Sequence, residues 1–426
     1  MVAFDRPLAR GDGLAYFMWL DSIAGDGDID LGNQAEHFAH VNAYQVYWNA
    51  ETERWATDFA HGSALLLAPT YWLAQAVERL GWLDVNREYF VGLQGRPFVY
   101  SFFGMLGVNL LALGALALAY AAARRFAGPA PSAWAALLLF LGTPALYYAT
   151  IEPFYAHIPA TFLAALSFYC LVRGEEGPRA LAWAFAAGLA GGFATLVRWQ
   201  MALLVCGAAL WLPLRRAWRD AAAFGMGFWA VAWHVLYTWQ WMFGQPKVVS
   251  AAESGFLSLP RHFFDVLFAD GRGLFVWAPL TLLAVAGWAL LARSKWALAL
   301  ALGGTLFLQT FINGGVIDWW GGWSYGMRRM TELYPLFVAG LAYLLERTAS
   351  RRWLRRSVRT VAVLCVAFSL LLFLSHLNFI NTVVEQPQGD RASVEIRYQL
   401  TQSSFHVTWL VIKDHYGPWA WSRPGP

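Results

Sequence analysis

The sequence has few charged residues, few cysteines and none of the common nucleotide-binding or hydrolase signatures. Only 14% of its 426 residues are charged, whereas soluble domains have about 25%. The three cysteines, Cys170, Cys206 and Cys365, lie inside apolar runs, where we expect small buried side chains rather than disulfides or metal ligands. There is no GxxxxGK[ST], HExxH or GxSxG motif, and no GxGxxG follows a strand. ATP hydrolysis and the common nucleotide-binding folds are therefore not indicated.

Hydrophobic residues are abundant, at 58% of the chain, and aromatic residues reach 17%, including 24 tryptophans. Ten apolar runs approach the roughly 20 residues that cross a bilayer. They cover residues 97–123, 132–151, 154–172, 180–197, 199–213, 221–243, 274–292, 296–313, 333–345 and 360–380. We predict an all-α polytopic membrane protein, a helical bundle with about ten spans. The net charge of +4 is spread among loops, so no basic patch indicates nucleic-acid binding.

Basic residues concentrate in alternate loops, most densely in the arginine-rich segment 347–359. The positive-inside rule places these loops in the cytoplasm. The remaining loops then lie outside, and three regions follow: an extracytoplasmic acidic first loop with amphipathic helices (1–96), a membrane bundle with outer loops 243–273 and 314–331 (97–381), and an extracytoplasmic C-terminal tail (382–426). The apolar but interrupted segment 62–80 suits an amphipathic helix in the outer interface.

Within the first outer loop, residues 11–33 contain five aspartates, Asp12, Asp21, Asp26, Asp28 and Asp30. Asp12 lies between glycines and ahead of an apolar-aromatic run that contains Tyr16, so it is either a helix N-cap or a general base at the mouth of the bundle. The run DGDID has the alternating carboxylates of a divalent-cation site, but it lacks the glycine and glutamate of an EF-hand loop. A solvated turn, recognition of substrate hydroxyls by Asp28 and Asp30, and a divalent cation at Asp26, Asp28 and Asp30 all stay open.

Two further outer segments hold ionisable residues between apolar runs. In IEPFYAHIP, Glu152 and His157 either begin a helix or face a cavity, because charged groups at that depth are costly. In TLVRWQ, Arg198 either extends to the membrane interface or binds a lipid-borne phosphate, whose geometry a guanidinium matches.

The loop DWWGGWSYGMRRMTELYP combines glycines, aromatic rings and two arginines on the side that the charge bias otherwise depletes. An interfacial belt explains its tryptophans but not its arginines. We therefore expect anion binding by Arg328 and Arg329, with Lys247 as a weaker candidate of the same kind. The ring-bearing residues expected to contact substrate are Trp320, Trp323 and Tyr325 of this loop, together with Tyr16 of the first outer loop.

These segments occur in a particular order: GDGLAYFMWLDSIAGDGDIDLGN, HGSALLLAP, EPFYAH, LVRWQ, GRGLFVWAPL and WWGGWSYGMRR. In that order they resemble bacterial membrane glycosyltransferases of the GT-C fold, close to the protein-mannosyltransferase and aminoarabinose-transferase group. The resemblance implies an enzyme of the bacterial inner membrane with its active face outside. Such enzymes take a sugar from a polyprenyl-phosphate donor and attach it to an extracytoplasmic glycan, lipid or protein.

The resemblance also implies roles for particular residues. Asp12 matches the position of the family's catalytic aspartate, and Arg198 and Arg328 match positions that contact phosphate. A helix normally precedes the acidic loop in this family, and nothing ahead of Asp12 would drive export of the loop. Our hypothesis is that one more spanning helix precedes Met1 in the natural protein.

The chemistry expected from the residues agrees with that implication. A donor used outside the cytoplasm must arrive attached to a lipid, and Asp12 would act as base in a single inverting displacement while arginines stabilise the leaving phosphate. A transporter or flippase of lipid-linked sugars is the alternative, although charges gather at one face rather than at the bilayer midplane. A non-catalytic scaffold is the third hypothesis. The sequence identifies neither the sugar and acceptor nor the oligomeric state.

Overall fold

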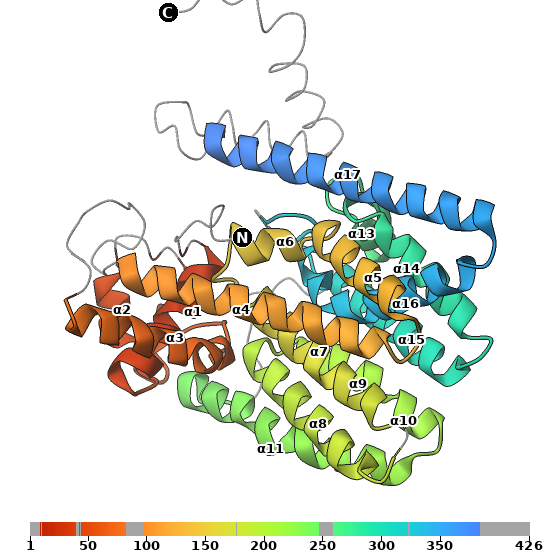
Figure 1. Ribbon diagram of the computed structural model, residues 1–426. Helices are drawn as coiled ribbons and strands as arrows, with labels where there is room; N and C mark the ends of the chain where they lie inside the picture. The colour runs from red at the N-terminus through yellow and green to blue at the C-terminus, as the bar shows by residue number, and fades with distance from the viewer. Residues whose placement is uncertain are drawn as a thin grey trace, which may run out of the picture.

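The protein is represented by a computed structural model that describes residues 9, 11–39, 42, 44–81, 98–175, 177–246, 259–322 and 324–383, with side chains described up to residue 377. The described part of the chain is mostly helical (Figure 1). The exception is a small antiparallel hairpin of β1 (Tyr47–Asn49) and β2 (Arg54–Ala56), which pairs Trp48 with Trp55. The all-α prediction missed this hairpin because each strand is only three residues long.

Fourteen further α-helices follow the N-terminal region in the part of the chain that the structure describes. The first twelve are α4 (Phe98–Ala123), α5 (Pro129–Leu141), α6 (Ala145–Thr150), α7 (His157–Arg173), α8 (Ala180–Val197), α9 (Met201–Ala209), α10 (Trp211–Leu214), α11 (Trp218–Phe243), α12 (Phe263–Phe268), α13 (Leu274–Trp277), α14 (Leu280–Leu291) and α15 (Trp296–Gly314). The 3₁₀ helix η4 (Arg328–Leu333) comes next, and it is followed by α16 (Tyr334–Thr348) and α17 (Arg352–Val383).

Apolar helices confirm a polytopic helical membrane protein, but about ten spans are not confirmed. Four helices, α4, α8, α15 and α17, are long and apolar enough to cross a bilayer, and four shorter apolar segments cover 129–141, 157–173, 201–214 and 280–291. Prolines explain part of the difference. Pro144 separates α5 from α6 within one predicted span, and Pro279 separates α13 from α14 within another, since proline cannot donate the backbone hydrogen bond of a helix interior.

Glycines allow the helices of the bundle to approach closely. A Cβ atom added to Gly188 of α8 would lie 2.0 Å from the Phe224 carbonyl oxygen of α11. One added to Gly287 of α14 would lie 1.9 Å from the carbonyl oxygen of Gly340 in α16. Small residues of this kind are typical of helix contacts inside membranes, where close packing replaces the hydrophobic effect as the main source of association.

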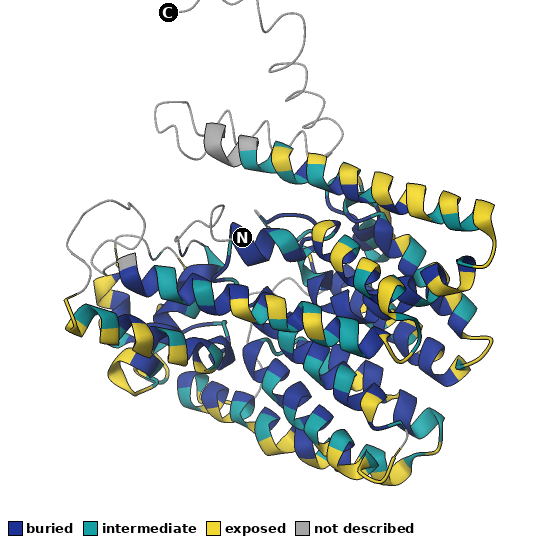
Figure 2. Cartoon of the chain, in the orientation of Figure 1, coloured by how far each residue is buried: buried dark blue, intermediate teal, exposed yellow. Residues whose placement is uncertain are grey.

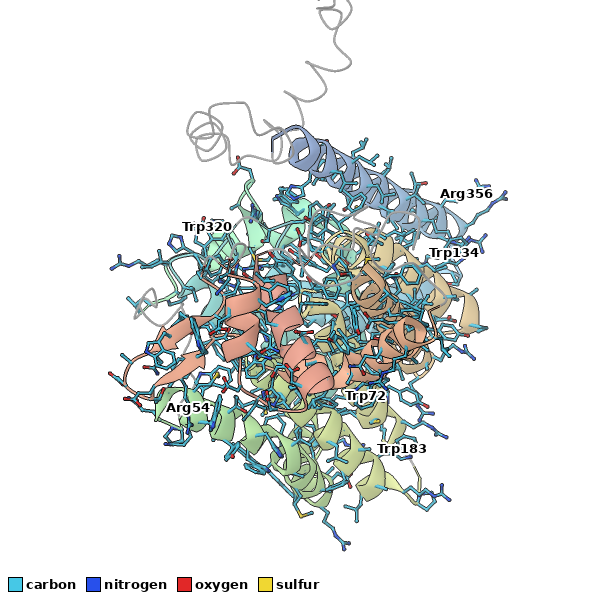
Figure 3. All side chains as sticks on the ribbon, turned by 90° about the vertical axis from the view of Figure 1, so that its left-hand side faces the viewer. Arg54, Trp72, Trp134, Trp183, Trp320 and Arg356 are labelled. Carbon is cyan, nitrogen blue, oxygen red and sulfur yellow. The ribbon has the colours of Figure 1, made fainter. Side chains whose placement is uncertain are left out.

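The N-terminal region forms a cap at one end of α4 (Figure 1). It consists of α1 (Asp12–Leu20), the π-helix η2 (Asp21–Asp26), α2 (Gly32–His37), the hairpin and α3 (Gly62–Arg79). One face of α3 is buried, including Tyr71, whereas Trp72, which Figure 3 labels, is exposed although its Nε1 donates to the Ala24 carbonyl oxygen. The segment predicted as an amphipathic helix is therefore a helix with one buried face and one exposed apolar face.

The last described helix, α17, lies across α5, α14 and α16 and exposes a long outward face (Figure 2). Large apolar side chains such as Leu364 and Leu371 are exposed there, as expected where lipid covers the protein. The cysteine prediction is only partly right. All three cysteines are free, but Cys170 alone is buried, while Cys206 is exposed and Cys365 half-buried. The predicted tail beyond residue 383 and much of the outer loop 243–273 lie outside the described residues.

Candidate active site

A cavity of about 530 Å³ opens where α1, the start of α7, the α8–α9 connection and the segment 318–329 meet. The α8–α9 connection follows the C-terminal end of α8, and the segment 318–329 joins the C-terminal end of α15 to the region before α16. Together with the N-terminal end of α7, these helix ends gather at one end of the bundle. The cavity brings together residues as far apart in the sequence as Gly11 and Arg329. Six predicted site residues line it: Asp12, Tyr16, His157, Arg198, Arg328 and Arg329.

Asp12 is the first residue of α1, and its carboxylate does not cap that helix. The N-cap is Gly11, whose φ of 51° lies in the left-handed region that favours glycine. A Cβ atom at Gly11 would also lie 2.7 Å from the Tyr155 hydroxyl oxygen. The N-cap interpretation of Asp12 is therefore wrong, and Gly11 instead lets the backbone enter the cavity wall so that the carboxylate faces the cavity.

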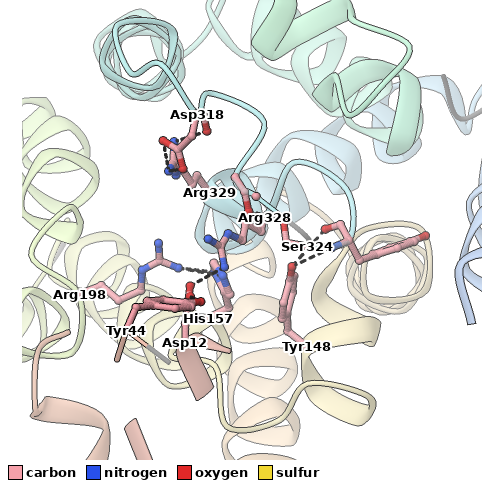
Figure 4. A network of polar contacts seen from close by, with 12 residues as sticks. Asp12, Tyr44, Tyr148, His157, Arg198, Asp318, Ser324, Arg328 and Arg329 are labelled. Atoms are coloured by element: carbon pink, nitrogen blue, oxygen red, sulfur yellow. Dashed lines mark hydrogen bonds and ion pairs between the residues drawn. The ribbon is translucent and has the colours of Figure 1, made fainter. Parts of the chain in front are cut away.

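Arg328 and Tyr44 hold the Asp12 carboxylate (Figure 4). The Arg328 Nη1 donates to one oxygen at 2.6 Å, and the Tyr44 hydroxyl donates to the other at 3.2 Å. Burial raises the pKa of the Asp12 carboxyl, but the charge of Arg328 and the hydrogen bonds from Arg328 and Tyr44 lower it more, so its pKa lies below the usual value. Asp12 is thus an ionised carboxylate at neutral pH.

Arg198 forms a second charged cluster with His157 and the buried carboxylate of Glu332. Glu332 was not among the residues predicted for the site. The Arg198 Nη1 donates to Glu332 Oε1 at 2.8 Å and also contacts the ring of His157, whose Nδ1 lies 2.9 Å from the same glutamate oxygen. Glu332 is only 3% exposed. Burial raises the pKa of the Glu332 carboxyl, but Arg198 and His157 lower it more, so this group is also ionised.

Arg329 forms the third ion pair of the cavity. Its Nη2 donates to both oxygens of Asp318, at 2.8 and 2.9 Å. The turn between them contains Gly321 and Gly322 with φ values of 78° and 67°, which only glycine adopts without strain. The 3₁₀ helix η4 then presents Arg328 and Arg329 to the cavity as neighbours. Three arginines and their three carboxylates therefore occupy one site.

Buried Arg272 holds this glycine turn by hydrogen bonds. Its Nη1 donates to the Trp320 carbonyl oxygen at 3.3 Å and to Ser324 Oγ at 3.1 Å, and it also donates to the Gly322 carbonyl. A buried guanidinium that donates to successive carbonyls stabilises a loop that has no regular secondary structure. Arg272 occurs in the quoted motif GRGLFVWAPL, yet nothing in that motif indicates which backbone it would bind.

Several predicted substrate contacts do not line the cavity. Tyr325 is buried behind it, stacked on Tyr147 with ring centroids 4.8 Å apart, and its hydroxyl donates to the Ser369 carbonyl oxygen at 3.1 Å. Glu152 and Trp320 are half-buried outside the lining. Trp323 and Lys247 lie outside the described residues.

The remaining aspartates of the first loop bond to their own turn. Asp28 accepts from the Ser22 hydroxyl at 3.1 Å and from the Asp30 backbone N–H at 3.0 Å, and Asp30 accepts from the Gly32 N–H at 2.9 Å. Asp26 accepts from Gln34 and from Asn33, at 2.6 and 2.8 Å. None of these three aspartates lines the cavity. Across the described ranges no cluster of three metal-ligating side chains occurs, so the predicted divalent cation is unsupported.

Asp21 is the fully buried member of this loop. It accepts from the Tyr71 hydroxyl of α3 at 2.5 Å and from Gln34 at 3.5 Å. This carboxylate, for which the sequence indicated no role, joins η2 to α2 and α3. Its burial and its position away from the cavity mark it as part of the scaffold that positions α1.

Solved structures share this arrangement of helices. No protein-family model and no curated protein sequence matches the chain. The chain is similar to ArnT from Cupriavidus metallidurans bound to undecaprenyl phosphate, with a TM-score of 0.55 and 14% identity. It is also similar to ArnT in the apo state, with a TM-score of 0.50 and 17% identity. Both matches cover 96% of this chain and 74% of the other. The predicted resemblance to the aminoarabinose-transferase group is confirmed for the fold.

Proposed function

We propose that this protein is a membrane glycosyltransferase that moves a sugar from a polyprenyl-phosphate donor to an acceptor outside the cytoplasm. The observation that supports this best is the cavity in which ionised Asp12 lies among Arg198, Arg328 and Arg329. A carboxylate base beside several fixed cations suits a reaction that takes a proton from an acceptor and releases an anion. ArnT, which has this fold, binds undecaprenyl phosphate in one of its structures.

The reaction is a single displacement at the anomeric carbon of the donor sugar. The acceptor hydroxyl oxygen forms the new bond to that carbon while Asp12 accepts the hydroxyl proton. The bond from the anomeric carbon to the phosphate oxygen breaks, and polyprenyl phosphate leaves with the electron pair. Attack opposite the leaving group inverts the anomeric configuration.

The arginines act where negative charge develops. Phosphate is a good leaving group, so the departing oxygen needs electrostatic stabilisation more than it needs a proton. Arg198 and Arg328 reach the cavity from different segments, and both guanidinium groups match phosphate oxygens in a bidentate geometry. We assign them to the donor phosphate. Tyr16 and His157, which also line the cavity, are assigned to the substrate surroundings.

The cavity is proposed to face the outside of the bacterial inner membrane. Its segments lie at the end of the bundle opposite three arginines. Arg173 ends α7, Arg179 directly precedes α8, and Arg347 lies in the last turn of α16. The positive-inside rule places those arginines in the cytoplasm. Nucleotide sugars are cytoplasmic, so a sugar used on the other side requires a lipid-linked carrier.

The test is a transfer assay in proteoliposomes. Purified protein is supplied with a polyprenyl-phosphate-linked sugar and an envelope extract as acceptor, and free polyprenyl phosphate is measured. We expect its release to require both the protein and the extract. Movement of the intact lipid-linked sugar across the bilayer without release would instead favour the flippase alternative.

A further inference from the structure

The three ion pairs of the cavity differ in where the carboxylate lies. Glu332, the partner of Arg198, does not line the cavity and holds its arginine from behind. Asp12, the partner of Arg328, lines the cavity itself and is the proposed base. Arg198 can therefore meet an incoming anion without losing its carboxylate, whereas Arg328 and Asp12 face the same space.

Arg328 has unused donor capacity. In the part of the chain that the structure describes, its guanidinium makes one side-chain hydrogen bond, to Asp12, and stands 5.6 Å from the centre of the Tyr155 ring. A guanidinium has five N–H donors. A phosphate group offers two oxygens in the geometry of these donors and forms a stronger, bidentate contact than the single bond to Asp12.

Asp12 would not lose all its partners if Arg328 turned to a phosphate. The Tyr44 hydroxyl donates to Oδ1, the oxygen that Arg328 does not bind. The carboxylate would stay oriented by Tyr44 while Oδ2 became free to accept a proton. The structure shows one arrangement of Arg328, paired with Asp12, and an anion in the cavity would favour a second in which the guanidinium binds that anion.

We propose that the donor phosphate takes Arg328 from Asp12, so that the catalytic base is released only in the donor complex. This inference depends on the proposed function. Paired with Arg328, Asp12 is a weak base that water and acceptor hydroxyls reach only in competition with the guanidinium. The exchange couples donor binding to base activation, and it implies that the donor binds before the acceptor is deprotonated.

The exchange predicts an unusual mutational result, which a double-mutant cycle measures. The ligand is polyprenyl phosphate in detergent micelles, and binding is compared for wild type, D12N, R328Q and the double variant. D12N removes the competitor for Arg328 and should tighten binding about tenfold, within the range of typical coupling between sites. In the R328Q background the same substitution should leave binding unchanged.

A matched control separates the exchange from general charge. Asp58 also lines the cavity, but its carboxylate accepts from the Tyr47 hydroxyl at 2.8 Å rather than from an arginine. D58N removes the same charge from the same cavity and should tighten binding by much less than D12N, because Asp58 does not compete for Arg328. Equal tightening by D12N and D58N, or tightening by D12N that persists in R328Q, would overturn the exchange. The contrast between D12N and D58N does not require R328Q to fold. Failure of the wild type to bind polyprenyl phosphate would reject the proposed function, and the exchange with it.

Discussion

The first acidic segment divides into two regions that use the same side chain in different ways. At its start, Asp12 points into a cavity and meets an arginine from a segment more than 300 residues away. From Asp21 to Asp30, each carboxylate instead accepts hydrogen bonds from its own loop or from α3. The comparison teaches that a high number of carboxylates in one segment does not identify the reactive one. The reactive carboxylate is identified by the partner that it contacts in the folded chain.

The largest difference is expected between D12N and D28N. Removal of a general base typically costs 10²- to 10⁴-fold in rate, so we expect D12N to lower transfer about a thousandfold. D28N keeps a hydrogen-bond acceptor in an exposed turn and should transfer normally. Release of polyprenyl phosphate is measured for both. Comparable activities in the two variants would remove the distinction between the regions.

A second prediction extends the comparison to the cations of the cavity. R198A should lower transfer by about 10²- to 10³-fold, the range found when one preorganised charge-stabilising donor is removed. R261A, which removes an exposed arginine of an outer loop, should change transfer little. R198K should recover part of the loss, because the charge remains while the bidentate geometry does not. The rates of the three variants are compared at equal amounts of folded protein.

In the second region we expect effects on stability rather than on rate. Y71F removes the hydroxyl that donates to buried Asp21, which should lower the free energy of unfolding by about 1–3 kcal/mol. Transfer per folded molecule should stay near the wild-type value. Thermal unfolding in detergent gives the stability, and Y237F, which alters an exposed tyrosine, is the matched control. Loss of transfer in fully folded Y71F would show that this region acts in the reaction.

The smallest effect is expected from a chelator. The carboxylates of Asp26, Asp28 and Asp30 are occupied by hydrogen bonds within the loop, so they offer no preformed cation site. We expect the transfer rate with EDTA to match the rate with added Mg²⁺ or Ca²⁺. A large loss of transfer rate on chelation that one of these ions restores would show that the loop is a functional metal site.

Composition was enough to predict the helical membrane class, because apolar run length and charge asymmetry are properties of the sequence itself. The GT-C-type fold was instead predicted from the resemblance of the ordered motifs to a known family. The number of spans was not predictable to the same degree, since Pro144 and Pro279 interrupt runs whose composition is uniform. Short helices between such breaks have the same composition as long ones.

The site was predictable where an ionisable residue interrupts an apolar run, as for Arg198, or stands beside glycine, as for Asp12. Glu332 was missed although it lies in the same quoted loop as Arg328, because its partners Arg198 and His157 are more than 130 residues away. Tyr325 and Asp28 were placed at the site on residue type alone. The sequence could not indicate that both side chains form hydrogen bonds within the protein, Tyr325 to the Ser369 carbonyl and Asp28 to the Ser22 hydroxyl.

The most direct test of the central claim is mass spectrometry of the lipids that co-purify with the protein. For the wild type we predict a polyprenyl phosphate, with or without an attached sugar, and for R198A purified in the same way we predict its loss. The R261A variant should retain the lipid. Absence of any polyprenyl phosphate from the wild type, or equal amounts in the wild type and R198A, would contradict the claim that this cavity binds a lipid-linked donor.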